Sequence, residues 1–216
     1  MKEDWKIKQD VEEELDWTPD VVATRIGVEV ADGIVSLSGH PASYSEKLAA
    51  EDAARRVSGV RAVVVDMQVR VPHHEVRDDA DIAGAADTLL RWTVGLPEGA
   101  VTVQVEKGHV TLRGDVDWAY QSRLVTRGIA HMRSVTGVTN LICVRADLAA
   151  ADIGDAISRA LKRHAEREAK HIDIKVEDGT VTLTGKVDSA SERDAARGAA
   201  WATRGVTAVV DNLEFN

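Results

Sequence analysis

A stretch of eight residues occurs three times in the chain, and it restricts the possible folds more than any other feature. It reads DGIVSLSG from position 32, KGHVTLRG from position 107 and DGTVTLTG from position 178. In each copy a two-residue turn ending in glycine separates two runs in which apolar and polar residues alternate. This pattern favours a β-hairpin with a type I′ turn, because both central residues of that turn need positive φ. The sequence therefore predicts three hairpins of the same kind.

A two-residue turn also fixes which residues face each other across the hairpin. Around the first turn, Val30 pairs with Val35 and Val28 pairs with Leu37. The same spacing gives equivalent apolar pairs in the other copies: Val105 with Val110, Val103 with Leu112, Val176 with Val181, and Ile174 with Leu183. Apolar residues thus lie opposite apolar residues on one face of each hairpin, as packing against a core requires.

The spacing of the hairpins divides the chain into three domains. Successive turn glycines are 75 and 71 residues apart in a chain of 216 residues, which indicates tandem copies of one small domain. We place the repeats at 1–71, 79–146 and 151–216. Units of about 70 residues bury little apolar surface alone, so we expect them to pack against one another.

Helices are predicted on both sides of each hairpin. Ile7, Val11 and Leu15 are spaced by four residues and form an apolar stripe on a first helix. Equivalent stripes occupy the later repeats at Ile82, Ala86 and Leu90 and at Ile153, Ile157 and Leu161. A second helix is expected over 43–58, 118–133 and 189–204, and a last strand over 60–71, 135–144 and 206–215. The predicted fold class is α+β, with three tandem αββαβ units, each a three-stranded sheet covered by two helices.

Glycines recur at the turns, at the predicted ends of the second strands and after the second helices. We assign them structural roles as turn and cap residues, which use positive φ or close backbone approach. They are Gly33, Gly39, Gly59, Gly108, Gly114, Gly179, Gly185 and Gly205. Ser134 replaces the glycine that ends the second helix in the other repeats, and it predicts a looser end of the middle repeat.

Composition narrows the classes of function. A net charge of −9 argues against binding of nucleic acid, and no run of apolar residues is long enough to span a membrane. The single cysteine, Cys143, excludes an intrachain disulfide. The first residues lack the apolar core of a signal peptide. We therefore expect a cytoplasmic protein, or a periplasmic one if a signal peptide was removed before residue 1.

Motifs for catalysis and for cofactor binding are missing from the sequence. The chain has no Walker or dinucleotide-binding pattern, no nucleophile elbow and no H-E-x-x-H. The run His73-His74-Glu75 is a weak metal candidate, because it offers no fixed third ligand. We expect a protein that is not an enzyme, with no catalytic residues, no cofactor and no metal.

The repeat resembles the BON domain, a module of osmotically inducible periplasmic proteins and other bacterial envelope proteins. The third copy shows it most fully: the alternating strands around Asp178-Gly179, then Ser191-Glu192-Arg193, Ala195-Ala196, Gly205-Val206 and Asp211-Asn212-Leu213. All three repeats match. The resemblance implies an αββαβ fold, contact with phospholipid or envelope surfaces and a part in osmotic or envelope stress. It implies no enzymatic activity.

Three tryptophans are the candidate binding residues. Trp17 and Trp92 occupy equivalent positions, two residues beyond the apolar stripe of the first helix, and Trp118 opens the second helix of the middle repeat. Indole rings favour sites with one apolar and one wet side, such as a membrane interface or a protein contact. In the alternative interpretation, the rings cap small cores or fill junctions between repeats.

The sequence leaves three functional hypotheses. The first is a BON-type binding protein that contacts phospholipid or an envelope partner through these tryptophans. The second is a soluble scaffold that binds a protein partner through grooves between repeats or an open sheet edge. The third is self-association, because the first helix is acidic over 12–14 whereas the third repeat begins with basic residues at Arg159, Lys162 and Arg163.

Overall fold

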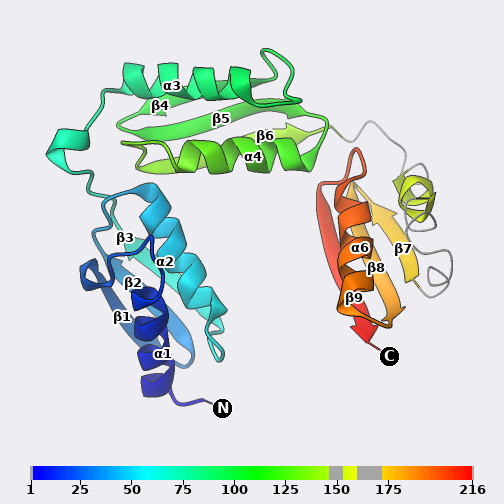
Figure 1. Ribbon diagram of the computed structural model, residues 1–216, viewed down its shortest axis with the longest axis horizontal. Helices are drawn as coiled ribbons and strands as arrows, with labels where there is room; N and C mark the ends of the chain where they lie inside the picture. Colours follow the sequence, from blue (N-terminus) through cyan, green and yellow to red (C-terminus); the bar gives the residue numbers. More distant parts are fainter. Residues whose placement is uncertain (1, 146–152, 160–171, 216) are drawn as a thin grey trace. The chain divides into compact units, whose positions relative to one another are not determined.

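The computed structural model describes residues 2–145, 153–159 and 172–215 (Figure 1). Each repeat contains one three-stranded sheet, and helices are interleaved with the strands along the chain. The predicted α+β class, with three tandem αββαβ units, is therefore confirmed. Of the residues singled out at the start of the third repeat, Arg159 is described. Leu161, Lys162 and Arg163 lie outside the described residues.

The elements follow the same order in each repeat. The first repeat contains α1 (Asp4–Asp16), the 3-10 helix η1 (Ala23–Arg25), β1 (Ile26–Ala31), β2 (Ile34–Gly39), α2 (Tyr44–Arg56) and β3 (Ala62–Met67). After the 3-10 helix η2 (His73–Glu75), the second contains α3 (Asp79–Trp92), β4 (Val101–Glu106), β5 (His109–Val116), α4 (Ala119–Ala130) and β6 (Gly137–Val144). In the third, residues 153–159 are helical, followed by β7 (Ile172–Glu177), β8 (Thr180–Val187), α6 (Ala190–Trp201) and β9 (Ala208–Phe215).

The second strand of the hairpin is the central strand of every sheet. In the first and third repeats it is antiparallel to the strand before it and parallel to the last strand. The predicted pairs are confirmed in these two sheets: Val28 with Leu37, Val30 with Val35, Ile174 with Leu183, and Val176 with Val181. The parallel pairing was not predicted, and it makes α2 and α6 crossover helices.

The core of the first repeat lies between its sheet and its two helices, which cover one face of the sheet (Figure 1). The predicted stripe of α1 points into this core, since Ile7, Val11 and Leu15 are all buried. From the sheet, Val35 and Leu37 of the central strand meet them. The opposite face carries no helix and is called the helix-free face below. The small side chains of α2 let that helix lie close to the sheet, and the fully buried ones are Ala50, Ala53 and Ala54.

Each hairpin turns through two residues with positive φ, as a type I′ turn requires. In the first repeat φ is 52° at Asp32 and 73° at Gly33, and the other two turns have similar values. An aspartate at the start of the preceding helix binds the turn in two of the repeats. The carboxylate of Asp4 accepts the N–H groups of Asp32 and Gly33 at 2.8 and 3.0 Å, and Asp79 accepts those of the second turn at 2.8 Å.

The turn is also joined to the loop that follows the second helix. In every repeat the carbonyl oxygen of the turn glycine accepts a backbone N–H from this loop. The donor and acceptor pairs are Arg61 and Gly33 at 2.8 Å, Thr136 and Gly108 at 2.9 Å, and Thr207 and Gly179 at 2.8 Å. This bond links the hairpin to the parallel strand that begins one residue later.

The eight glycines assigned to turns and caps all have positive φ. Gly114 and Gly185 were predicted to end their strands, but β5 and β8 continue for two residues beyond them. At Gly114 φ is 144°, and a Cβ atom there would overlap the carbonyl oxygen of Ala100. The same oxygen accepts the N–H of Asp115 at 3.0 Å. The close approach of two backbone segments at Gly114 therefore occurs inside the strand and not at its end.

Ser134 does not leave the middle repeat loose, contrary to the expectation from the sequence. Its φ is +65°, so it takes the left-handed conformation that glycine has in the other repeats. Its buried hydroxyl donates to the carbonyl oxygen of Glu75 at 2.6 Å and accepts the N–H of Arg77 at 2.9 Å. The side chain therefore fastens the linker that precedes the repeat.

An ion pair fastens the second helix of the third repeat to its edge strand. The guanidinium of Arg193 in α6 donates through Nε to the carboxylate of Asp211 in β9 at 2.8 Å. This bond lowers the pKa of Asp211, and the N–H of Leu213, at 3.1 Å from the other carboxylate oxygen, adds to the shift. In the second repeat the neutral pair Ser122 and Asn140 occupies the same positions, at 2.9 Å.

Replacing Gly114 by alanine should destabilise the protein by roughly 2 kcal/mol or more, because φ is unfavourable and the added Cβ overlaps a backbone oxygen. Denaturant unfolding measures the effect. The matched control is Gly84→Ala in α3 of the same repeat, where a Cβ would meet nothing within 4 Å. That change should be neutral or stabilising by up to about 1 kcal/mol. Equal effects of the two substitutions would contradict the described backbone at Gly114.

Replacing Asp211 by asparagine should destabilise the third repeat at pH 7 by about 1 kcal/mol. Because the folded pKa is lowered, this contribution is complete above about pH 5 and is lost as the pH falls below the ordinary value of about 3.9 towards the folded pKa. Unfolding measured from pH 7 to pH 2.5 should therefore show the two proteins converging in acid. The exposed carboxylate of Asp173 in the same repeat provides the control, Asp173→Asn, for which no such convergence is expected.

Candidate functional site

Each of the three candidate tryptophans lies at a helix boundary. Trp17 follows the last residue of α1 and Trp92 is the last residue of α3, and their exposed fractions are 85% and 82%. Trp118 precedes α4, is half-buried, and its ring centroid lies 6.3 Å from that of Tyr120. The first two rings therefore contribute little to the cores of their repeats.

Helix geometry explains why the first two rings point outward. Successive residues of an α-helix are rotated by about 100°, so a residue two positions after a core residue lies on the opposite side of the helix. Leu15 and Leu90 are buried. Trp17 and Trp92, two positions later, consequently face solvent at the start of the loop that leads to the first strand.

A buried side chain holds this loop in the first repeat. Glu46 lies in the first turn of α2 and is only 5% exposed. Its carboxylate accepts the N–H of Val22, in the loop after Trp17, at 3.0 Å, and the N–H of Ala42 at 2.6 Å. Ser43, the N-cap residue of α2, accepts the N–H of Glu46 at 3.1 Å. The loop is thus fixed to the start of the second helix.

Gln121 holds the equivalent loop of the second repeat with different chemistry. It is 3% exposed, its side-chain oxygen accepts the N–H of Trp118 at 3.0 Å, and its side-chain nitrogen donates to the carbonyl oxygen of Gly95. An amide can donate to a carbonyl oxygen, whereas a carboxylate can only accept. The loop therefore presents a carbonyl to Gln121 where the first repeat presents an N–H to Glu46.

Two further exposed apolar residues, which were not singled out from the sequence, lie near the end of α3 and the start of α4 in the second repeat. Val94 follows Trp92 in the loop and is 86% exposed, and Tyr120 on the first turn of α4 is 43% exposed. A Cβ atom at Gly95 would lie 3.1 Å from the Tyr120 hydroxyl, which places the ring beside the loop. The run from Trp92 to Pro97 is apolar apart from Thr93, and this was the signal available in the sequence.

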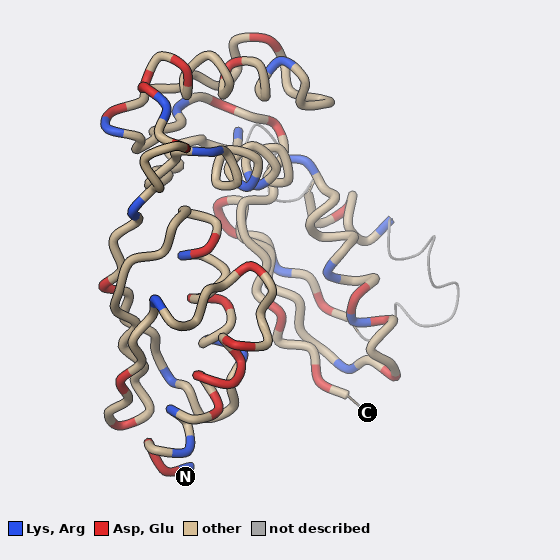
Figure 2. Tube along the Cα trace, turned by 60° about the vertical axis from the view of Figure 1, so that its left-hand side comes forward, with Lys and Arg blue, Asp and Glu red and all other residues tan. Residues whose placement is uncertain are grey.

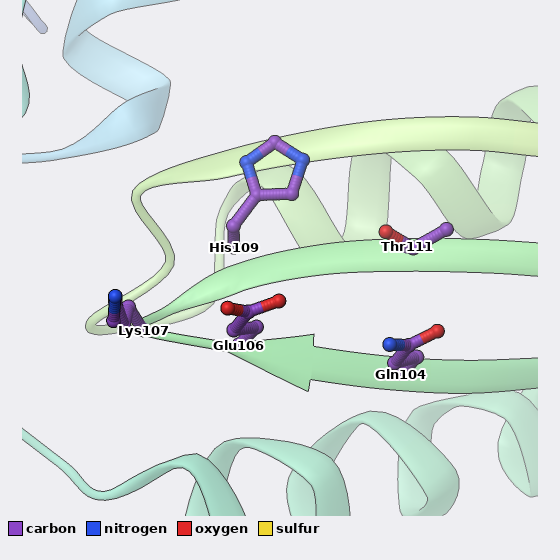
Figure 3. A pocket seen from close by; sticks show the side chains of 5 residues that line it. All are labelled: Gln104, Glu106, Lys107, His109 and Thr111. Atoms are coloured by element: carbon purple, nitrogen blue, oxygen red, sulfur yellow. The ribbon is translucent and has the colours of Figure 1, made fainter.

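A separate shallow cavity of about 330 Å³ lies on the helix-free face of the middle sheet (Figure 3). Its lining is polar and comes from β4, β5 and the turn between them: Gln104, Glu106, Lys107, His109 and Thr111. The Nε2 atom of His109 lies 2.8 Å from the Thr139 hydroxyl, so that residue has a structural partner.

The described part of the chain contains no group of three or more His, Cys, Asp or Glu side chains that could hold a metal ion. His73 and His74 are exposed in η2, and His74 lies 3.5 Å from the carboxylate of Glu75. Cys143 is exposed in β6. Among the described helices, none is long and apolar enough to cross a membrane.

The fold and these sites define a chain of repeated small α+β domains with exposed apolar loop ends. A family model described as "BON domain" matches residues 3–71, 78–146 and 149–216. Together these matches cover nearly the whole sequence, and the chain belongs to the BON domain family. The resemblance recognised in the sequence is therefore confirmed. A search of curated proteins found no match.

Solved structures with partial likeness come from type III secretion systems. CdsD of Chlamydia trachomatis, described as a structural protein of that system, is 15% identical over 98% of this chain and 92% of its own, with a TM-score of 0.27. Its C-terminal domain is 14% identical over the full length of both chains, with a TM-score of 0.28. The periplasmic domain of PrgH from S. typhimurium is 11% identical over 89% of this chain and 95% of its own, with a TM-score of 0.23. The family assignment rests on the BON matches alone.

Replacing Gln121 by alanine should free the loop after α3, since both of its side-chain hydrogen bonds would be lost. We expect faster amide hydrogen exchange over residues 93–100 and a stability loss of about 1–2 kcal/mol. The exposed residue Gln104 of the same repeat gives a matched control, Gln104→Ala, that should leave the loop protected. Unchanged exchange in the Gln121 variant would show that the side chain does not hold the loop.

Proposed function

We propose that this protein is a non-enzymatic BON-type binding protein that contacts phospholipid surfaces through the tryptophan-bearing ends of its first and second repeats. The observation that carries the proposal is the equivalent placement of Trp17 and Trp92 with exposed fractions of 85% and 82%. A part in osmotic or envelope stress belongs to the same proposal and is supported by membership of the family.

The chemistry of indole supports a lipid surface as the target. An indole ring has an apolar body and one N–H donor, and it is favoured at the boundary between lipid headgroups and hydrocarbon. Burial of one such ring is worth roughly 2 kcal/mol, which is weak binding for a single residue. Two rings on one chain act together, because attachment of the first raises the local concentration of the second.

Flotation with phosphatidylcholine vesicles tests the proposal on the full chain. The Trp17→Ala and Trp92→Ala variants should each float less than the unsubstituted protein, and the double variant should float least. Trp5→Ala is the matched control, since Trp5 is also exposed, at 63%, but lies at the opposite end of α1 from Trp17. Failure of the unsubstituted protein to float with vesicles of any composition would overturn the proposal.

A protein partner is the second candidate, and it is supported by a different surface. On the helix-free face of the first sheet, Ile34 is 42% exposed and Val64 is 51% exposed. The edge strands β1 and β3 flank β2 in this sheet and could accept an added strand. This candidate would be favoured if a protein bound stoichiometrically to the chain, if Val64→Ser abolished that binding, and if the chain did not bind lipid.

A further inference from the structure

We infer that the loop after α3, with the first turn of α4, is the dominant membrane contact, and that it favours zwitterionic over anionic bilayers. The contact surface, called the 92–97 surface below, consists of Trp92, Val94 and Tyr120. The inference rests on the proposed function and adds to it the element of the fold and the class of lipid. The surface lies in one repeat, so it does not depend on how the repeats are arranged.

The 92–97 surface brings several exposed apolar side chains together in one repeat. Val94, at 86%, has the largest exposed fraction of the large apolar residues described, and Trp92 beside it is 82% exposed. Leu124, one turn after Tyr120 on α4, is 49% exposed and continues the apolar strip along the helix. Isolated exposed apolar side chains are common on soluble proteins, but neighbouring ones mark contact sites.

The loop is also held in place before any contact is made. Gln121 fixes the carbonyl of Gly95, and backbone bonds from Leu96 to Thr93 at 3.2 Å and from Ala100 to Pro97 at 3.1 Å form successive turns. A preformed loop loses little conformational entropy when it binds, so more of the free energy of burial appears as affinity.

Charged neighbours make the first repeat the weaker contact. Trp17 is flanked in the sequence by Asp16 and Asp20, both exposed. A carboxylate that enters the headgroup region loses hydration, so these residues oppose insertion of the ring. The loop from Trp92 to Pro97 contains no charged residue.

The net negative charge of the chain favours one kind of bilayer. Glu98, Asp115 and Asp117 line one shallow cleft together with Arg145. Asp117 is paired with Arg204 at 3.0 Å, and the exposed Arg91 directly precedes Trp92. The chain as a whole has a net charge of −9, and acidic positions are spread along its described parts (Figure 2). An anionic surface repels such a protein, whereas a zwitterionic bilayer carries no net charge and leaves apolar burial as the main interaction.

The test uses the full chain and vesicles of phosphatidylcholine alone or mixed with phosphatidylglycerol. Val94→Ser should lower the partition coefficient on phosphatidylcholine by about threefold to tenfold, and more than Trp17→Ala does. The matched control, Val76→Ser, changes a valine that is 59% exposed but lies in the linker directly after η2. It should leave partitioning unchanged. Added phosphatidylglycerol should weaken binding at low salt, and salt should restore it.

The outcomes separate this inference from the proposed function. No binding of the unsubstituted protein to either vesicle overturns both. Binding that is unaffected by Val94→Ser, or that falls more with Trp17→Ala, overturns the assignment of the 92–97 surface and leaves the proposed function intact. Stronger binding to phosphatidylglycerol that declines with salt overturns the assignment of lipid class alone. A circular dichroism melt of each variant ensures that only folded protein is compared.

Discussion

The fold of each repeat depends on how its hairpin turn is held in a left-handed conformation. The turn glycine accepts an N–H from the loop after the second helix, and this bond recurs at Gly33, Gly108 and Gly179. It joins the antiparallel hairpin to the parallel strand and so sets the start of the second ladder. A side chain at Gly33 would meet the carbonyl oxygen of Gly59 at 3.1 Å. Glycine therefore serves both the turn and the close approach of the loop.

The hairpins could be predicted because their information is local. A two-residue turn fixes the register, and alternation fixes the buried face, so the pairing of Val28 with Leu37 follows from the sequence. The order of the strands could not be predicted, since all three strands carry similar apolar residues and nothing local chooses between neighbours. The mistaken expectation for Ser134 has the same origin: its partners, Glu75 and Arg77, are almost 60 positions away in the sequence.

The candidate site, too, could be predicted only where its signal was local in the sequence. The positions of Trp17 and Trp92 were visible as a repeat, and their outward direction follows from helix geometry. The roles of Glu46 and Gln121 were hidden, although Ser43 and Glu46 form a recognisable capping pattern. A capping box predicts bonds within the helix start, but the second bond to a distant loop depends on the packing of the repeat. Substitution of glutamate by glutamine at this position is matched by a loop that offers a carbonyl instead of an N–H.

The bonds of Ser134 also shorten the unattached part of the linker between the first two repeats. Arg70 donates its N–H to Pro41 of the first repeat at 2.8 Å, and Glu75 is bonded to Ser134 of the second. Only residues 71–74 lie between these attachment points. Each end of the linker is therefore part of the repeat beside it, and the connection proper is only four residues long.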